Sequence, residues 1–530
     1  DETIVAVEES ELAPPPGSRN LSAELARNQV VVEGQHLDEE DDSENDRLRN
    51  KRMRRRQGFI VLFLVAAAAA TAAIIVVIMN NGSGGGSGPS PSPTSPRNEG
   101  WKLLGSEPLF GLTDDDAINF GKDVALSNDG NRLVVGQPGV DLSLTELAVG
   151  RVNIYDWNQN ESIWELDAFF DGTGRDSRAG SSVSINGNGT RIAIGEPTAF
   201  GERGQVSIYE QEFVTGEWFM VGDEPLSLED DTMMGKFGFD VAMSDDGTTI
   251  ACSAPFTDLS ENYTSTGLVR VYQQERIRDD VSGTTIVRWS QRGQDILGRD
   301  INESLGWSLA MSADGNVLAI GAIGLNDNAG SVRVFIWNGQ YWQLTGEQLG
   351  GINAEDRFGI SLDLSADGTI LAVGASQYPD GGQVTVWERF NDDRWTMLGQ
   401  PIDGSTSPRG KLGSSLDLDV TGFIVAVGSP DHSSSSSGGG SDGDENDDGG
   451  LEANGMVQVY KYDRTLDDWV QQNGDVEGSL DRDGFGSAVA LSADGSRVAG
   501  GAPRATFDGR FNEVGRVEVY DMIVVPDETE

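Results

Sequence analysis

The sequence predicts an all-β chain built around a seven-bladed β-propeller, preceded by one transmembrane helix and a disordered N-terminal tail. Three observations lead to this prediction: a 19-residue pattern that recurs seven times, a strand of fixed form after each copy, and one long apolar run ahead of them. Glycine is abundant, at 69 of 530 residues. Together with many β-branched residues, this favours β structure with frequent turns.

The recurring pattern defines the blades. Its last copy, FGSAVALSADGSRVAGGAP (485–503), begins with Phe-Gly, carries an Asp-Gly in its middle and ends with Gly-Ala-Pro. The turn glycine lies ten residues after the first position in every copy. The other copies occupy 120–138, 179–197, 237–255, 305–323, 358–376 and 412–430. Self-similarity of this kind indicates a repeat architecture.

Two further strands complete each unit. A third strand follows each copy in the form Gly-x-Val-x-Ile/Val-aromatic, as in GRVEVY (515–520), and a fourth begins near a tryptophan. These tryptophans are Trp164, Trp218, Trp289, Trp342, Trp395 and Trp469. The seventh unit ends at Asp521 without a fourth strand, and WKLLGSEPLFG (101–111) precedes the first unit. We therefore expect a propeller over 100–521, closed by the strand of Trp101, and a C-terminal tail over 522–530.

The segment ahead of the propeller predicts a membrane anchor. Residues 58–79 form an uncharged run long enough to span a bilayer, and RLRNKRMRRR (47–56) precedes it. The positive-inside rule places 1–57 in the cytoplasm as a disordered tail, and everything after residue 80 outside the cell or in a lumen. Residues 80–99 form a Gly/Ser/Pro stalk. Glycosylation is expected at the sequons of Asn160, Asn188, Asn262 and Asn302.

Charge and composition narrow the function classes. Residues 100–530 carry 28 basic and 71 acidic side chains, so the propeller should repel nucleic acid. Cys252 is the only cysteine, so no intrachain disulfide can form. His36 and His432 are the only histidines and lie in the tail and in a long insert, which argues against nucleophilic chemistry that depends on histidine.

With Phe-Gly at its start and Gly-Ala-Pro at its end, the repeat resembles the FG-GAP repeat of integrin α-chain propellers, over roughly 100–521. The resemblance implies an extracellular, ligand-binding propeller with a role in cell adhesion. In such repeats the first hairpin can hold calcium in a longer Asp-rich loop. Here the hairpin is only Ser-x-Asp-Gly, as at Asp494-Gly495, so we expect a tight turn there and no ion.

The long insert of blade six (431–455) is the other candidate for a calcium site. Asp444, Asn446, Asp448 and Glu452, with a glycine after Asp448, match the spacing of an oxygen-rich calcium loop. An EF-hand is disfavoured because Gly455 stands where a bidentate glutamate is needed. The alternative is that an acidic, glycine-rich tract contains this spacing by accident and stays disordered.

Loop lengths indicate which face of the propeller binds a ligand. The turns between first and second strands never vary in length, whereas the second-to-third loops vary widely, and variable loops on a rigid scaffold usually carry function. That face is expected to present an acidic rim to an extracellular protein or glycan. The rim residues are Asp114, Asp115, Asp116, Asp230, Asp231, Asp356 and Asp483. A merely solvated rim is the alternative.

The predicted function is a receptor-like binding or adhesion module, not an enzyme. The alternative is a glycosidase-like propeller hydrolase that uses carboxylates near the central channel. Most inner strands have a small residue at their sixth repeat position, but blades five and six have Asp363 and Asp417 there. Such a pair could supply an acid and a base. The same two side chains could instead cap backbone amides.

Overall fold

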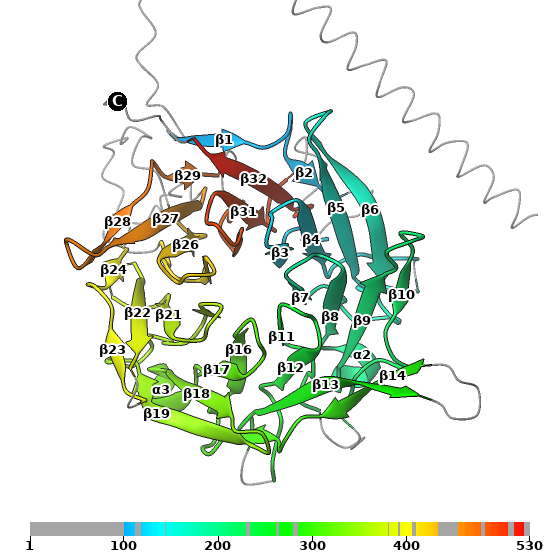
Figure 1. Cartoon of the computed structure of the whole chain (residues 1–530), viewed down its shortest axis with the longest axis horizontal. Helices are drawn as coiled ribbons and strands as arrows, with labels where there is room; N and C mark the ends of the chain where they lie inside the picture. The colour runs from blue at the N-terminus through cyan, green and yellow to red at the C-terminus, as the bar shows by residue number, and fades with distance from the viewer. Residues whose placement is uncertain are drawn as a thin grey trace, which may run out of the picture. The chain divides into compact units, whose positions relative to one another are not determined.

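The computed structural model describes residues 100–111, 118–143, 145–228, 234–260, 264–278, 285–379, 381–390, 393–404, 410–432, 454–478, 483–506 and 513–523. Seven antiparallel sheets of four or five strands follow one another around a central axis (Figure 1). The prediction of an all-β, seven-bladed propeller is therefore confirmed.

Blades 1 to 4 run outward from a short inner strand to a fourth strand that carries tryptophan. Blade 1 has β3 (Val124–Leu126), β4 (Arg132–Gln137), β5 (Arg151–Asn158) and β6 (Ile163–Asp171). Blade 2 has β7 (Ser182–Ile185), β8 (Arg191–Glu196), β9 (Gln205–Gln211) and β10 (Trp218–Met220). Blade 3 has β11 (Val241–Met243), β12 (Thr249–Ala254), β13 (Leu268–Arg278), β14 (Thr285–Gln291) and β15 (Ile296–Leu297). Blade 4 has β16 (Leu305–Met311), β17 (Val317–Ala322), β18 (Ser331–Trp337) and β19 (Trp342–Gly350).

Blades 5 to 7 repeat this order, and a short extra strand pairs with the third strand of each, as β15 does in blade 3. Blade 5 has β20 (Leu362–Leu364), β21 (Ile370–Ala375), β22 (Gln383–Arg389), β23 (Trp395–Met397) and β24 (Ile402–Asp403). Blade 6 has β25 (Ser415–Leu418), β26 (Ile424–Ser429), β27 (Met456–Asp463), β28 (Asp468–Gln471) and β29 (Val476–Glu477). Blade 7 has β30 (Ala488–Leu491), β31 (Arg497–Ala502), β32 (Arg516–Met522), β1 (Trp101–Leu103) and β2 (Leu109–Phe110).

The two ends of the propeller meet in blade 7. Its strand order is β1-β32-β31-β30, and β1 pairs antiparallel with β32 so that Trp101 lies opposite Met522. Figure 1 shows the blue N-terminal strand beside the red C-terminal one. The predicted closure by the strand of Trp101 is therefore confirmed, and all seven blades lie within residues 100–523.

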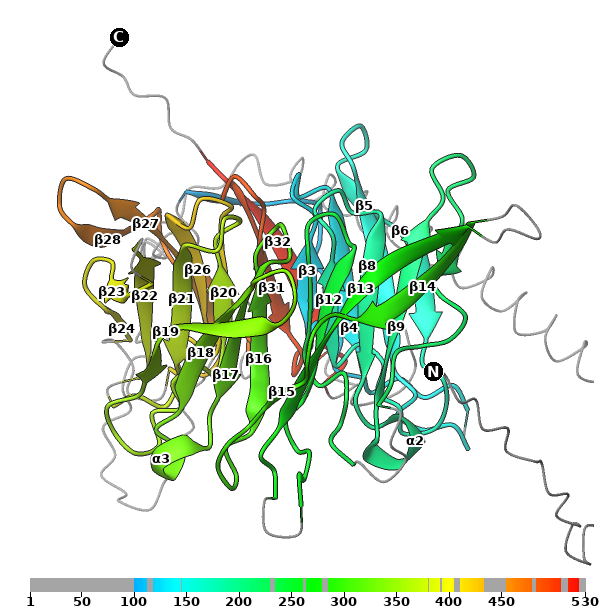
Figure 2. The same ribbon diagram turned by 60° about the horizontal axis from the view of Figure 1, so that its bottom comes forward.

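The propeller has two faces, which we name by their connections. The turn face carries the first-to-second-strand turns and the third-to-fourth-strand hairpins. The loop face carries the second-to-third and fourth-to-first loops, including α2 (Ala199–Glu202) and α3 (Leu325–Asn328). Figure 2 shows both helices on one side and the β5–β6 hairpin on the other.

A ring of backbone hydrogen bonds links the blades around the axis on the turn face. The residue at the ninth position of each repeat copy, directly before the Asp, Asn or Thr of the turn, donates its N–H to a carbonyl in the next blade. The acceptor is the residue at the same ninth position there. The donors run through Asn128, Gly187, Asp245, Ala313, Ala366, Val420 and Ala493, which donates back to Asn128, with N to O distances of 2.9 to 3.1 Å. The propeller is therefore closed at its centre as well as at its rim.

Glycines allow this close approach of neighbouring blades. A Cβ on Gly501 would lie 2.2 Å from the carbonyl oxygen of Gly121, and a Cβ on Gly136 would lie 2.1 Å from that of Gly180. Gly121 and Gly180 both have φ of 83°, which other residues rarely adopt. The glycine of Phe-Gly in one blade thus faces the glycine of Gly-Ala-Pro in the blade before it. This contact explains both ends of the repeat.

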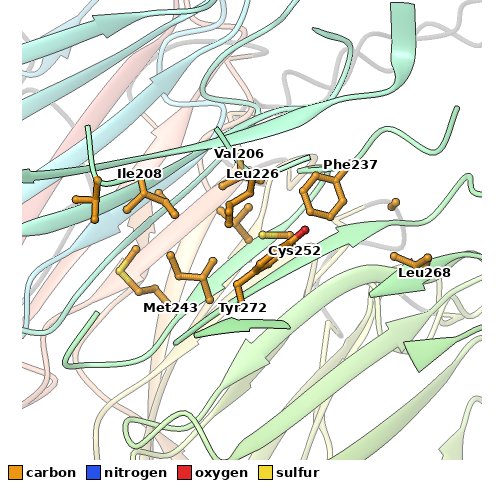
Figure 3. Packing of buried hydrophobic residues seen from close by; sticks show 13 residues of the cluster. Val206, Ile208, Leu226, Phe237, Met243, Cys252, Leu268 and Tyr272 are labelled. Atoms are coloured by element: carbon orange, nitrogen blue, oxygen red, sulfur yellow. The ribbon is translucent and has the colours of Figure 1, made fainter. Parts of the chain in front are cut away.

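Apolar side chains fill the space between blades. Figure 3 shows the cluster between blades 2 and 3, where Phe237, Val206 and Ile208 pack against Cys252 and Tyr272. Phe237 is the first residue of its repeat copy and is fully buried, as are its counterparts in other blades. Burial of this apolar surface is the main favourable term for holding adjacent blades together. Burial also raises the pKa of the Cys252 thiol, which keeps it protonated.

The predicted membrane anchor lies outside the described residues. Residues 1–57, 58–79 and 80–99 all precede the first of them. Among the residues described from Gly100 onward, no helix is both long and apolar enough to cross a membrane.

Candidate functional site

The Asp-Gly turns of the turn face are closed hydrogen-bonded boxes. In blade 7, Ser492 Oγ donates to Asp494 Oδ1 at 2.7 Å, and the same oxygen accepts the N–H of Ser496 at 3.0 Å. Gly495 has φ of 71°. Partial burial alone would raise the pKa of Asp494, but hydrogen bonds from Ser496 and Ser492 outweigh it and hold the pKa below its usual value. The carboxylate is thus engaged by the turn, as expected from the short hairpin.

Two blades build the same box from other residues. In blade 6 the roles are exchanged, because Thr421 Oγ1 donates to Asp419 Oδ2 at 2.6 Å while Asp419 Oδ1 accepts the N–H of Ile424 at 2.8 Å. In blade 2, Asn188 Oδ1 accepts the N–H of Thr190 at 3.0 Å. The described part of the chain contains no group of three or more His, Cys, Asp or Glu side chains that could hold a metal ion.

Most of the proposed site residues lie outside the described residues. These are the calcium candidates Asp444, Asn446, Asp448 and Glu452, and the rim residues Asp114, Asp115, Asp116, Asp230 and Asp231. The sequon at Asn262 also lies outside them, whereas Asn160, Asn188 and Asn302 are exposed. The calcium prediction therefore stays a prediction.

The two described rim residues are buried. Asp356 is 1% exposed, and its Oδ2 accepts the N–H groups of Ile352 and Asn353 at 3.1 and 2.7 Å. Asp483 is 0% exposed, accepts the N–H of Phe485 at 3.0 Å and pairs with the buried Arg516. These carboxylates fold inward and cap the fourth-to-first loops, because buried backbone amides need acceptors. They do not belong to an exposed acidic rim.

A central cavity of about 250 Å³ lies between the seven inner strands, and Asp363 and Asp417 line it. Asp363 Oδ2 accepts the N–H of Leu418 in the next blade at 2.8 Å, and Asp417 Oδ2 accepts that of Leu491 at 2.6 Å. The two carboxyl groups also share a hydrogen bond. Burial raises the pKa of both, and the charge of Asp363 raises that of Asp417 further, so the pair keeps a shared proton to a higher pH than an exposed carboxyl would. The pair therefore connects blades 5, 6 and 7.

A second pair of inner carboxyls was missed at the sequence level. Asp123 Oδ2 accepts the N–H of Val183 in blade 2 at 2.7 Å, and Asp240 Oδ2 accepts that of Leu309 in blade 4 at 2.7 Å. Ser182 between them donates to Asp240 at 3.0 Å. All three stand at the fourth position of their repeat copies. The signal was present in the sequence, since that position is Asp or Ser in six of the seven copies.

These buried carboxyls predict a pH dependence of stability. Burial raises the pKa of Asp123 from 3.8 to about 6, and burial with the nearby charge of Asp123 raises that of Asp240 to about 7. Each contribution is complete below pH 3.8 and is lost as the pH rises through the folded-state pKa, since the unfolded chain releases these protons first. We expect stability to fall by up to about 1.4 kcal/mol per pH unit for each group, as the pH rises from 3.8 to about 6 for Asp123 and from 3.8 to about 7 for Asp240.

Thermal unfolding at several pH values measures this slope. Asp240→Asn should flatten it, and Asp327→Asn, which changes an exposed carboxylate on α3, should leave it unchanged. Equal slopes for the wild type and Asp240→Asn would contradict the assignment.

The loop face exposes apolar side chains. Phe200 on α2 is 62% exposed, and Met234, Ile301 and Ile352 in the fourth-to-first loops are 65%, 55% and 83% exposed. These loops belong to consecutive junctions from blade 2 to blade 5. The loop face therefore exposes an apolar side chain at each of these places, as the third-to-fourth hairpins of the turn face do at Phe213 and Leu466.

No protein-family model and no curated protein matches the chain. Among solved structures, it is similar to hydrazine synthase from Kuenenia stuttgartiensis, at 13% identity over 73% of this chain and 93% of that one, with a TM-score of 0.44. It is also similar to a putative 6-phosphogluconolactonase from Bacteroides uniformis, at 11% identity over 68% and 87% of the two chains, with a TM-score of 0.41. Neither likeness carries a functional argument.

Proposed function

We propose that this chain is a membrane-anchored binding module that holds an extracellular or lumenal ligand on the loop face of its propeller. The observation that carries the proposal is the contrast between the two faces near the axis. On the turn face, the Asp-Gly turns and the inner backbone groups are engaged with one another. On the loop face, the loops are of unequal length and expose side chains such as Ile352. The turn face also exposes apolar side chains, such as Phe213, so the variable loops are what distinguishes the two faces.

The anchor is part of the proposal. Residues 58–79 would span the membrane once, with residues 1–57 in the cytoplasm and the propeller on the other side. Asn160 lies exposed at the β5–β6 hairpin, so a glycan there should appear as a mass shift that an endoglycosidase removes and Asn160→Gln abolishes. Cleavage of the propeller by protease added to intact, unpermeabilised cells would support the cell surface. Protection that persists after the plasma membrane alone is opened would, together with a glycan at Asn160, support an internal compartment. Cleavage at that step would place the propeller in the cytosol and contradict the proposed topology.

The binding function is tested with residues 93–530, which include all seven blades and the closing strand. Arrays of glycans, peptides and lipids should yield a ligand that the heat-unfolded fragment does not bind. Running the arrays with calcium and with a chelator also tests the insert site. The insert site is supported if binding depends on calcium, is lost in Asp448→Ala and persists in Ser441→Ala, a control in the same insert. Binding that does not depend on calcium would contradict a calcium site there.

The alternative function is hydrolysis by the cavity carboxyls. In its favour, Asp363 and Asp417 share a hydrogen bond, and both have raised pKa values. The hydrolase function would be established if residues 93–530 turn over a glycoside, Asp417→Asn abolishes this activity and Asp327→Asn keeps it. If melting shows that Asp417→Asn is folded and no glycoside is turned over by the wild type, the carboxyls act only as caps between blades.

A further inference from the structure

The inner strands carry basic residues where they begin, on the loop face, although the chain as a whole is strongly acidic. Two residues of each repeat copy flank the start of the inner strand there: the residue before the first position and the residue at the third. The first set is Asn119, Arg178, Lys236, Ser304, Arg357, Lys411 and Gly484, and the second is Lys122, Ser181, Phe239, Trp307, Ile360, Ser414 and Ser487. We call these residues the mouth ring. It holds five basic and no acidic side chains, in a chain with 38 basic and 86 acidic ones.

The basic residues of the first set stand on strained backbone. Arg178, Lys236 and Arg357 have φ of 56°, 57° and 54°, in the left-handed region that favours glycine. Only blade 7 has glycine at this position, as Gly484. A side chain other than glycine or asparagine there costs about 1 kcal/mol or more. The backbone is left-handed at this position in all seven blades, and four of the blades place a cation there.

Several of these charges form no ion pair with any residue that the structure describes, although the charge of Lys122 partly offsets the raised pKa of the adjacent Asp123. Lys411 is neutralised, since its Nζ lies 2.7 Å from Asp431. Within the described residues, no ion pair involves Lys122, Arg178 or Arg357, and the Nζ of Lys236 is 3.7 Å from an exposed Glu202 oxygen. The unpaired cations therefore lie on blades 1, 2 and 5, with a weakly paired one on blade 3.

An aromatic surface lies between the cations of blades 3 and 5. The rings of Phe239 and Trp307, in neighbouring blades, are 5.0 Å apart, and that of Phe256 lies 5.5 Å from Phe239. Each of the three is half-buried, so part of each ring faces solvent. The Nζ of Lys236 is 4.9 Å from the Phe256 ring centre. Arg357 and Ile360 hold the corresponding positions in blade 5, next to blade 4 with its Trp307. We call the residues from Lys236 to Ile360 of the mouth ring the arc.

Recognition at this arc must rely on side chains. The inner-strand amides nearest the mouth ring are already engaged, since Asp123 accepts the N–H of Val183 and Asp240 accepts that of Leu309. An extended peptide could not add to the sheet here, because β-addition needs free amides along an edge. A rigid ligand with an apolar ring face and anionic substituents fits instead.

We infer that the mouth ring binds an acidic oligosaccharide, whose sugar rings stack on Trp307 and Phe239 while its anionic groups pair with Arg357 and Lys236. The inference rests on the proposed binding function and specifies the ligand class. Physiological salt screens the acidic side chains that lie more than about 8 Å away, so only close carboxylates such as Glu202 oppose the contact. Either carboxylate or sulfate groups on the sugar would supply the negative charge that pairs with Arg357 and Lys236.

Titration of residues 93–530 with an oligogalacturonate, a sulfated galactan oligosaccharide and a neutral galactan oligosaccharide tests this inference. We expect at least one acidic oligosaccharide to bind at least tenfold more tightly than the neutral one. Arg357→Met and Trp307→Ala should each weaken it at least tenfold. The matched control Arg276→Met removes the same charge from the exposed outer part of β13 and should leave the affinity unchanged. Melting curves confirm that each variant is folded.

The two acidic probes separate carboxylate from sulfate recognition. Failure of both to bind, or binding that survives Arg357→Met and Trp307→Ala, would overturn the inference. So would a preference for poly-glutamate peptide over both oligosaccharides. The proposed function would fall only if the peptide and lipid arrays also gave no ligand.

Discussion

Replacement of Trp101 by alanine should lower the free energy of unfolding by about 3 to 5 kcal/mol, in the range found for buried tryptophans. Trp101 is 4% exposed and packs against Phe485 and Val498 of blade 7. Its Nε1 also donates to the carbonyl of Gly474 in blade 6 at 3.1 Å. The substitution therefore opens a cavity at the only blade built from both ends of the chain. Denaturant or thermal unfolding measures the loss.

Trp218→Ala is the matched control, since Trp218 begins the fourth strand of blade 2 but lies half-buried within a continuous part of the chain. It should cost less than Trp101→Ala, and equal losses would contradict a special role for closure. A chain that begins at residue 105 should show a second effect. Without β1, the edge of β32 is unpaired from Tyr520 to Met522, and size-exclusion chromatography should detect self-association.

Removal of the Glu303 carboxylate should cost about 3 to 5 kcal/mol, because it leaves a buried guanidinium without its anion. Glu303 and Arg333 are 2% and 1% exposed and form an ion pair. The other oxygen of Glu303 accepts the N–H of Asp300 at 3.0 Å. Glu303→Ala therefore loses the ion pair and a loop cap together, and unfolding curves should show the full effect.

Two further variants separate these causes. Glu355→Ala changes an exposed carboxylate in the next fourth-to-first loop and should cost less than about 0.5 kcal/mol. Adding Arg333→Met to Glu303→Ala should recover part of the loss, since it removes the unpaired charge. A Glu303→Ala variant as stable as Glu355→Ala would show that Arg333 finds another partner.

The blades were predictable because each makes the same contacts with its neighbours. Gly121 must face Gly501 as Gly180 faces Gly136, so the constraint is written into the sequence at a constant spacing. Closure followed from a missing fourth strand in the last unit and a spare one at Trp101. Both predictions depended only on the spacing of the repeat along the chain and on the number of strands in each unit.

The site was less predictable, because its residues lie in loops whose direction depends on tertiary contacts. Asp356 and Asp483 resemble solvated loop aspartates in the sequence, yet both point inward to cap amides. Asp123 and Asp240 were not predicted because the sequence does not show that the fourth position of the repeat faces the next blade, as their hydrogen bonds to Val183 and Leu309 do. The cations of the mouth ring emerge only when residues from seven distant segments are placed around one axis.

The ring of backbone hydrogen bonds on the turn face has an electrostatic consequence. A helix adds its peptide dipoles along one direction and so gains a charged end. Here the participating groups point head to tail around a circle, from Asn128 through Val420 and back, so the in-plane components of their dipoles cancel. That opening of the channel therefore gains little in-plane polarity from its main chain. The polarity of this opening is therefore set by side chains such as Asp245. These side chains can change in evolution without breaking the ring of backbone hydrogen bonds.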